Sequence, residues 1–191
     1  MIMTENKDKV VLDLCGGTGA WSEPYRDAGY DVHNITLPEY DVRKYVPPEN
    51  VYGILAAPPC THFSVSGAQY WKEKDKDGRT FEDITILTAC LMLIAKSQPV
   101  FWAIENPVGR MRKLLGNPSL IFHPCDFGDA WTKKTLLWGQ FNCPEKTPVE
   151  PAKVCSQGSW IQKLGGSSER TKILRSITPP GFAKAFFYAN R

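Results

Sequence analysis

The 191-residue sequence lacks several features that would place it in a familiar class at once. It has no run of about 18 apolar residues, so we expect no segment that spans a membrane. Its first residues, MIMTENKDKV, are polar and charged, so we expect no secretory leader. None of its six cysteines forms a Cys-x-x-Cys pair, which favours free thiols in a reducing cytosol. We therefore expect a cytoplasmic protein that has no metal site and does not bind a membrane.

The chain also carries little net charge, +3 in total, which permits an acidic partner without requiring one. Basic residues nevertheless gather at 110–113 and in the last third of the chain, where carboxylates are few. The latter are Lys133, Lys134, Lys146, Lys153, Lys163, Arg170, Lys172 and Arg175. Either an acidic ligand or an ordinary solvated surface explains this distribution.

Apolar runs alternate with helical patterns along the chain, and the hydrophobic content of 42% fits a globular core. We expect strands at residues 10–14, 30–36, 51–57, 100–106 and, on a weaker pattern, 135–141. We expect helices after the glycines at 16–19, over 84–94, over 109–117 and over 182–190. This alternation predicts one α/β domain over residues 1–191, with a mostly parallel, doubly wound sheet.

The remaining segments look less regular. Residues 61–80 are mostly polar and are expected to form a long, mobile loop, with a capping box of Thr80 and Asp83 at its end. A short strand is possible near Asp41. Residues 139–175, rich in Pro, Gly and Ser, are expected to form a small, irregular, basic appendage.

Three motifs follow predicted strands, at the strand ends where α/β sheets hold their ligands. In DLCGGTGAWS (13–22), a glycine-rich turn lets a ligand approach bare backbone, although the motif lacks the spacing of a dinucleotide fingerprint. In APPCTHFS (57–64), two prolines stiffen the backbone that leads to Cys60. In AIENPVG (103–109), Glu105 and Asn106 end another buried strand.

Each motif has a structural reading beside the functional one. The glycines could serve only a tight turn between strand and helix. A lone cysteine is commonly a small core residue, but a thiol with a lowered pKa is a nucleophile. Glu105 could cap a turn, or it could be desolvated enough to carry a proton.

The order of the motifs, DxxxGxG, then PPCxxFS, then ENP, resembles the DNA cytosine-5 methyltransferase family. The resemblance covers residues 10–115 well and the remainder loosely. It implies a Rossmann-like fold, S-adenosyl-L-methionine as cofactor and DNA as substrate. It also implies that Cys60 attacks C6 of a cytosine, while Glu105 bonds N3 and the exocyclic amine of the base.

The resemblance further assigns binding roles. The implied cofactor residues are Asp13, Cys15, Gly16, Gly17, Gly19, Trp21, Thr36, Asp41 and Pro58, and the implied substrate residues are Pro59, Ser64, Asn106, Lys133 and Lys134. Within this set, the Trp21 ring would pack on the adenine. Asp41 would receive the adenine amine, unless it is only a turn residue. Thr36 or Glu39 would stand in for the family's ribose-binding carboxylate.

The sequence departs from the family in three places. The QxRxR motif is absent, so Lys133 or Lys134 would replace it, and the GNxVxP tail motif is absent too. The stretch available for target recognition is much shorter than the family's. A homodimer or a partner subunit could supply the missing recognition surface. Alternatively, the sequence specificity is low, as would suit a phage modification enzyme.

Two alternatives to this enzyme remain at this stage. One is a catalytically impaired subunit that binds cofactor or DNA, and the other is methylation of RNA, of single-stranded DNA or of a free cytosine nucleotide. A zinc site made by His123, Cys125, Cys143 and Cys155 is a weaker hypothesis, because their spacing matches no zinc-finger pattern.

Overall fold

The computed structural model describes residues 6–154, 156, 158, 160–164 and 168–191. Its sheet has six strands in the order β2-β1-β3-β4-β6-β5. The strands are β1 (Val10–Leu14), β2 (Asp31–Ile35), β3 (Val51–Ala56), β4 (Phe101–Pro107), β5 (Leu120–Phe122) and β6 (Thr135–Gln140). The first four strands run parallel, and β6 is antiparallel to both β4 and β5. The predicted α/β class with a mostly parallel sheet is confirmed.

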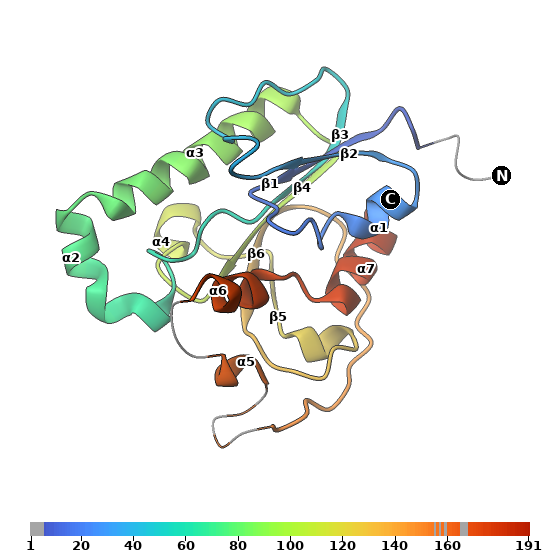
Figure 1. Ribbon diagram of the computed structural model, residues 1–191. Coiled ribbons are helices and arrows are strands. Elements are labelled where there is room, and N and C mark those ends of the chain that lie inside the picture. The colour runs from blue at the N-terminus through green and yellow to red at the C-terminus, as the bar shows by residue number, and fades with distance from the viewer. Residues whose placement is uncertain (1–5, 155, 157, 159, 165–167) are drawn as a thin grey trace.

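The helices cover both faces of this sheet. They are α1 (Glu23–Asp27), η1 (Val65–Tyr70), α2 (Trp71–Lys76), α3 (Arg79–Ser97), α4 (Arg112–Leu115), η2 (Pro124–Phe127), α5 (Trp160–Lys163), α6 (Glu169–Ser176) and α7 (Pro180–Ala189). Figure 1 shows α3 along one face of the sheet and α1 with α7 on the other. None of the helices in the described ranges is both long and apolar enough to cross a bilayer.

The two faces bury separate hydrophobic clusters, because neighbouring residues of a strand point to opposite sides. Leu12, Ile54 and Ile104 pack with α3 on one side. On the other side, α7 packs with α1 over the alternate positions of the same strands, such as Val11 and Leu55. Both faces of β1, β3 and β4 are therefore dry, which explains why these strands read as continuous apolar runs.

The strand order reverses between β1 and β3, since β2 lies on one side of β1 and β3 on the other. Connections that leave neighbouring strands in opposite directions open a crevice at the carboxyl ends of those strands. The glycine-rich turn follows β1, and the Pro-Pro-Cys turn follows β3. The topology therefore brings two of the three motifs to the edges of one crevice.

Several local expectations are wrong. Residues 61–80 are not a loose loop, because they include η1 and α2. Thr80 and Asp83 form no capping box: α3 begins at Arg79, and the two side chains bond instead to Arg110 and His62. Residues near Asp41 form turns, not a strand.

The segment that follows β6 runs alongside residues 125–130. Thr147 and Val149 donate backbone hydrogen bonds to the carbonyls of Asp126 and Cys125, both at 2.9 Å. Residues 141–154 form neither helix nor strand, as expected for the irregular appendage. The expectation of an irregular segment is wrong further along, because residues 160–163 form α5 and residues 169–176 form α6. We keep the single-domain boundaries as a prediction.

Candidate active site

The turn after β1 exposes its backbone. Gly17 and Gly19 have φ angles of 54° and 72°, in the left-handed region that favours glycine. A Cβ atom added to Gly17 would meet nothing within 4 Å. The backbone at Gly17 is therefore open for a ligand to lie directly against it, whereas Gly16 packs on Asp13 and Asn34.

Asp13 supports this turn from below. Its Oδ2 accepts a hydrogen bond of 2.6 Å from Ser22 Oγ, whereas its Oδ1 is buried with no hydrogen-bond partner among the described residues. Complete burial raises the pKa of the carboxyl to about 6, although the Ser22 bond and the Arg26 charge oppose that shift. Asp13 thus offers a buried oxygen, close to the glycines, that a ligand donor could satisfy.

Asn34, at the end of β2, is a site residue that sequence reasoning missed. Its Nδ2 donates to the Gly17 carbonyl at 3.1 Å, and its Oδ1 is buried without a partner in the part of the chain that the structure describes. A Cβ on Gly16 would lie 2.5 Å from that Oδ1, so the side chain packs directly on the turn. The register Asp13↔Asn34 of the parallel pair places it there. Three of the five residues of β2 are polar, so its composition does not single out Asn34.

The other residues considered for the ribose and the adenine lie in less favourable places. Thr36 follows β2 and its carbonyl accepts from Tyr40, while Glu39 is exposed. Both carboxylate oxygens of Asp41 accept hydrogen bonds from Arg43, which holds the pKa of that carboxyl down at about 2. This is the geometry of a turn residue, and the adenine role of Asp41 stays a prediction.

Trp21 does not offer a face to a ligand. It is 2% exposed, and its ring lies 5.8 Å from that of Phe182 and 5.5 Å from that of Phe186. The expectation that it packs on an adenine is therefore wrong in this geometry. The indole belongs to the core beneath α7 and supports the turn from inside.

Asn106 joins the second and third motifs. Its side chain is fully buried, and Nδ2 donates to the Pro58 carbonyl at 2.9 Å. The parallel pairing Ala56↔Ile104 sets β3 and β4 side by side just before these residues. The Pro-Pro-Cys turn is thus held against the end of β4, which explains why the sequence needs an amide directly after Glu105.

Cys60 and Glu105 act on one another at this strand edge. The Cys60 side chain is open to solvent on one side, yet surrounding protein atoms desolvate it, and this desolvation together with the Glu105 charge raises the pKa of the thiol. Burial likewise raises the pKa of Glu105, against the charge of Lys133. Of the two lysines considered, Lys133 is the one whose charge acts on both groups, by lowering both pKa values. Lys134 is exposed.

The chain beyond Cys60 turns back sharply over β4. Phe63 and Ser64 donate backbone hydrogen bonds to the Cys60 carbonyl at 3.0 and 2.9 Å. Ser64 also caps η1 by accepting from the Ser66 amide, so its hydroxyl has a structural partner already. Pro59 is half-buried next to Cys60. Their contacts with a substrate remain predictions.

A network of cations fixes the segment that follows. Arg110 donates to the His62 carbonyl at 2.9 Å and to Thr80 Oγ1 at 2.6 Å, and its guanidinium lies 4.9 Å from the centre of the Trp71 ring. Lys74, 8% exposed, donates to the Thr61 carbonyl at 2.8 Å. These bonds hold the backbone on both sides of His62, so the walls of the site are ordered before any substrate arrives.

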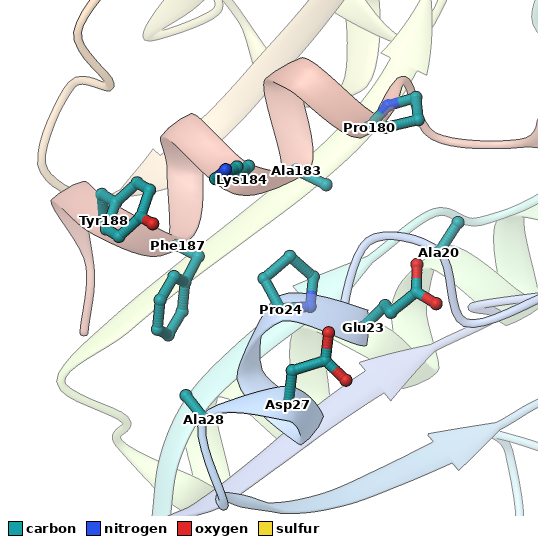
Figure 2. A pocket seen from close by; sticks show the side chains of 10 residues that line it. All are labelled: Ala20, Glu23, Pro24, Asp27, Ala28, Pro180, Ala183, Lys184, Phe187 and Tyr188. Atoms are coloured by element: carbon teal, nitrogen blue, oxygen red, sulfur yellow. The ribbon is translucent and has the colours of Figure 1, made fainter. Parts of the chain in front are cut away.

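A hollow of about 410 Å³ lies elsewhere, between α1 and α7. Figure 2 shows Pro24 of α1 and Ala28, which follows α1, facing Ala183 and Phe187 of α7 across it. None of the predicted site residues lines this hollow. No cluster of three or more His, Cys, Asp or Glu side chains that could hold a metal occurs in the described ranges, and Cys155 lies outside them.

No protein-family model matches the chain. A probable DNA (cytosine-5)-methyltransferase from Frog virus 3 (isolate Goorha) is 26% identical over an alignment of 209 positions. The alignment covers 89% of this chain and 94% of the viral protein. The resemblance to the DNA cytosine-5 methyltransferases is confirmed. The chain is thus similar over most of its length to a probable DNA (cytosine-5)-methyltransferase.

A crystal structure from E. coli, assigned as a DNA modification methyltransferase encoded within a prophage, is 18% identical to this chain. The match covers 84% of this chain with a TM-score of 0.47, and the chain spans about half, 55%, of that structure's length.

Proposed function

We propose that this methyltransferase transfers a methyl group from S-adenosyl-L-methionine to C5 of cytosine in DNA, through a covalent bond between Cys60 and the base. The observation that carries the proposal is the Asn106–Pro58 hydrogen bond of 2.9 Å, which holds the turn bearing Cys60 against β4, the strand that carries Glu105 near its end. A thiol and a carboxyl group thus flank one crevice next to an open glycine turn.

The residues around the glycine turn fit the cofactor. The open backbone at Gly17 suits a ligand that lies flat on the turn, and the unpaired oxygens of Asp13 and Asn34 suit the amino and hydroxyl donors of such a molecule. When bound, S-adenosyl-L-methionine supplies an electrophilic methyl group. Cys15, Gly16 and Gly19 would shape its pocket, with Pro58 on the facing turn.

The chain's own residues would activate the base. The Cys60 thiolate adds to C6, which breaks the C5–C6 double bond and makes C5 nucleophilic enough to take the methyl group. Glu105, whose raised pKa lets it hold a proton, donates to N3 and accepts from the exocyclic amine, so the negative charge of the adduct is spread. A base then removes the C5 proton, the C6–sulfur bond breaks, and the Cys60 thiolate is restored.

The substrate must present its base outside a duplex, because C6 of a stacked cytosine cannot reach a thiol at the edge of a sheet. Lys133 would neutralise a phosphate or the base oxygen beside the adduct, and Lys134 would add to the phosphate contacts. The segment after β6 is short, so we expect low sequence specificity or help from a second copy or another subunit.

The test is transfer of radiolabel from S-adenosyl-L-methionine to duplex DNA, single-stranded DNA, RNA and dCMP. We expect label in DNA at cytosine C5, and none with Cys60→Ser. DNA that contains 5-fluorocytosine should trap a covalent adduct, because fluorine cannot leave C5 as a proton does. A trap that survives Cys60→Ala contradicts the role of Cys60. If label appears only in RNA or only in dCMP, that molecule, and not DNA, is the substrate.

A further inference from the structure

The residue two positions after Cys60, His62, is tied by its side chain to the long helix α3. Its Nδ1 lies 2.7 Å from Asp83 Oδ2, and the two side chains are only 16% and 7% exposed. A carboxylate can only accept, so the imidazole donates from Nδ1. Burial raises the pKa of the Asp83 carboxyl, and His62 opposes that shift. The pair is a nearly buried hydrogen bond to a charged group, between the turn after β3 and the start of α3.

His62 belongs to the same closed turn as the thiol. The Phe63 and Ser64 amides both donate to the Cys60 carbonyl, at 3.0 and 2.9 Å. Because two such bonds close the backbone over residues 60–64, this turn moves as one unit. A side chain that is fixed at position 62 therefore also restrains the direction of the thiol.

The start of α3 is a firm anchor for this bond, because two other loops of the site are fastened to it. Arg110, which follows β4, donates both to the His62 carbonyl and to Thr80 Oγ1, at 2.9 and 2.6 Å. Arg43, which follows β2, donates to the Glu82 carboxylate. Loops that follow β2, β3 and β4 thus all send a side chain to the first turns of this helix. The acceptor for the imidazole is held in place by contacts that do not involve Cys60.

We propose that His62 is a positioning residue for methyl transfer, which holds the Cys60 turn on α3 through its hydrogen bond to Asp83. This inference rests on the proposed role of Cys60 as the nucleophile. A nucleophile that is misplaced by about 1 Å reacts roughly 100-fold more slowly, so a bond that restrains the turn contributes to kcat without touching a reacting atom.

The variants separate the hydrogen bond from the imidazole ring. His62→Leu removes the donor, whereas His62→Asn keeps an N–H group on the atom that corresponds to Nδ1. The double variant His62→Leu/Asp83→Leu also removes the carboxyl, so it loses the bond without leaving an unpaired charge buried. His33→Leu is the matched control, because His33 pairs with Asp31 at 3.2 Å on β2, where both side chains are more exposed.

The first measurement is hydrogen exchange of the Phe63 and Ser64 amides by NMR, on the full chain without cofactor or DNA. These amides report on the turn directly, because each bonds to the Cys60 carbonyl. We expect His62→Leu and the double variant to exchange them about tenfold faster, as for the loss of one hydrogen bond to a charged group. His62→Asn and His33→Leu should keep the parent rates.

The second measurement is the kinetics of methyl transfer to DNA. His62→Leu should lower kcat by roughly 10- to 100-fold and leave KM for S-adenosyl-L-methionine within about a factor of two, because the glycine turn belongs to β1. His62→Asn should recover most of the lost rate. A residue that only supports the fold would lower Tm and leave kcat of the folded enzyme unchanged.

Three results would overturn the inference: unchanged exchange of the Phe63 and Ser64 amides in His62→Leu, parent kcat in that variant, or an equal loss of kcat in His62→Asn. Hydrogen exchange needs no methyl transfer, so its outcome is separate from that of the labelling experiment. Faster exchange in His62→Leu, in a protein whose parent labels no DNA, would sustain the restraint on the Cys60 turn and reject the proposed reaction.

Discussion

Asp13 makes the stability of this protein depend on pH in an unusual direction. Its pKa of about 6 in the folded protein lies above the ordinary value of 3.8, because the carboxyl is completely buried. The folded state therefore holds this proton more tightly than the unfolded chain does. Its contribution to stability is complete below pH 4 and is lost as the pH rises through 6, by at most about 3 kcal/mol.

Asp13→Asn should remove this dependence, because an amide stays neutral and can still accept from Ser22. We expect the free energy of unfolding of the variant, relative to the parent, to become more favourable between pH 4.5 and pH 7.5. Urea unfolding at the two pH values, without cofactor, measures it. Asp8→Asn, which removes an exposed carboxylate before the same strand, is the control. An equal difference at both pH values would contradict the assignment.

Single residues were predictable where local sequence determines their place. Cys60 and Glu105 could be predicted to lie close together because Cys60 follows one apolar strand and Glu105 lies near the end of another, and parallel strands bring their ends together. Trp21 could not be placed, because the rings that bury it, Phe182 and Phe186, lie about 160 positions away in sequence. Asn34 was missed because its role depends on the register of β2 against β1, which no local pattern reveals.

At the scale of elements, the return of the chain over β4 depends on one glycine. A Cβ on Gly109 would lie 1.9 Å from the carbonyl oxygen of Phe63, a backbone atom that cannot turn aside. The Phe63 side chain is itself 1% exposed, so the segment after Cys60 cannot shift without disturbing the core. The position of the thiol and the identity of residue 109 are thereby coupled.

Gly109→Ala should displace the Cys60 turn and lower kcat for methyl transfer by about 100-fold, the cost of a misplacement near 1 Å. Cofactor affinity, measured by calorimetry, should stay within a factor of two or so, because the glycine turn belongs to β1. Gly67→Ala is the matched control, since its Cβ would approach only Lys74 Nζ at 3.4 Å and Thr61 O at 3.5 Å. Parent activity in Gly109→Ala would refute the coupling.

The strands and the two long helices were predictable, and the segment between β3 and α3 was not. Its charges, as in KEKDKD, are typical of a mobile loop. The structure instead pairs Asp75 with Arg110 at 2.9 Å and buries Lys74 against the Thr61 carbonyl. Long-range partners of this kind convert a polar sequence into ordered helices, and hydrophobic periodicity carries no information about them.

On the scale of the whole molecule, the last helix, α7, packs against residues from the N-terminal part of the chain. Phe182 of α7 is fully buried, and its ring stacks on that of Phe122 with centroids 4.1 Å apart. The same ring contacts Trp21, at the foot of the glycine turn. The C-terminal helix thus supports the glycine turn through the core.

Phe182→Ala should therefore cost about 3–5 kcal/mol of stability, because the surrounding rings cannot close the cavity. For a chain of this size the loss corresponds to a fall in Tm of roughly 10 °C or more. Phe81→Ala, at a ring 68% exposed on α3, is the matched control and should change the free energy of unfolding by no more than about 0.5 kcal/mol.

Thermal unfolding with and without S-adenosyl-L-methionine separates the loss of core packing from its effect on the glycine turn. The Phe182 variant should also lose part of the stabilisation that the cofactor gives, because Trp21 loses its support. A variant that melts early and yet gains as many degrees from the cofactor as the parent would show that the core under α7 and the glycine turn are independent.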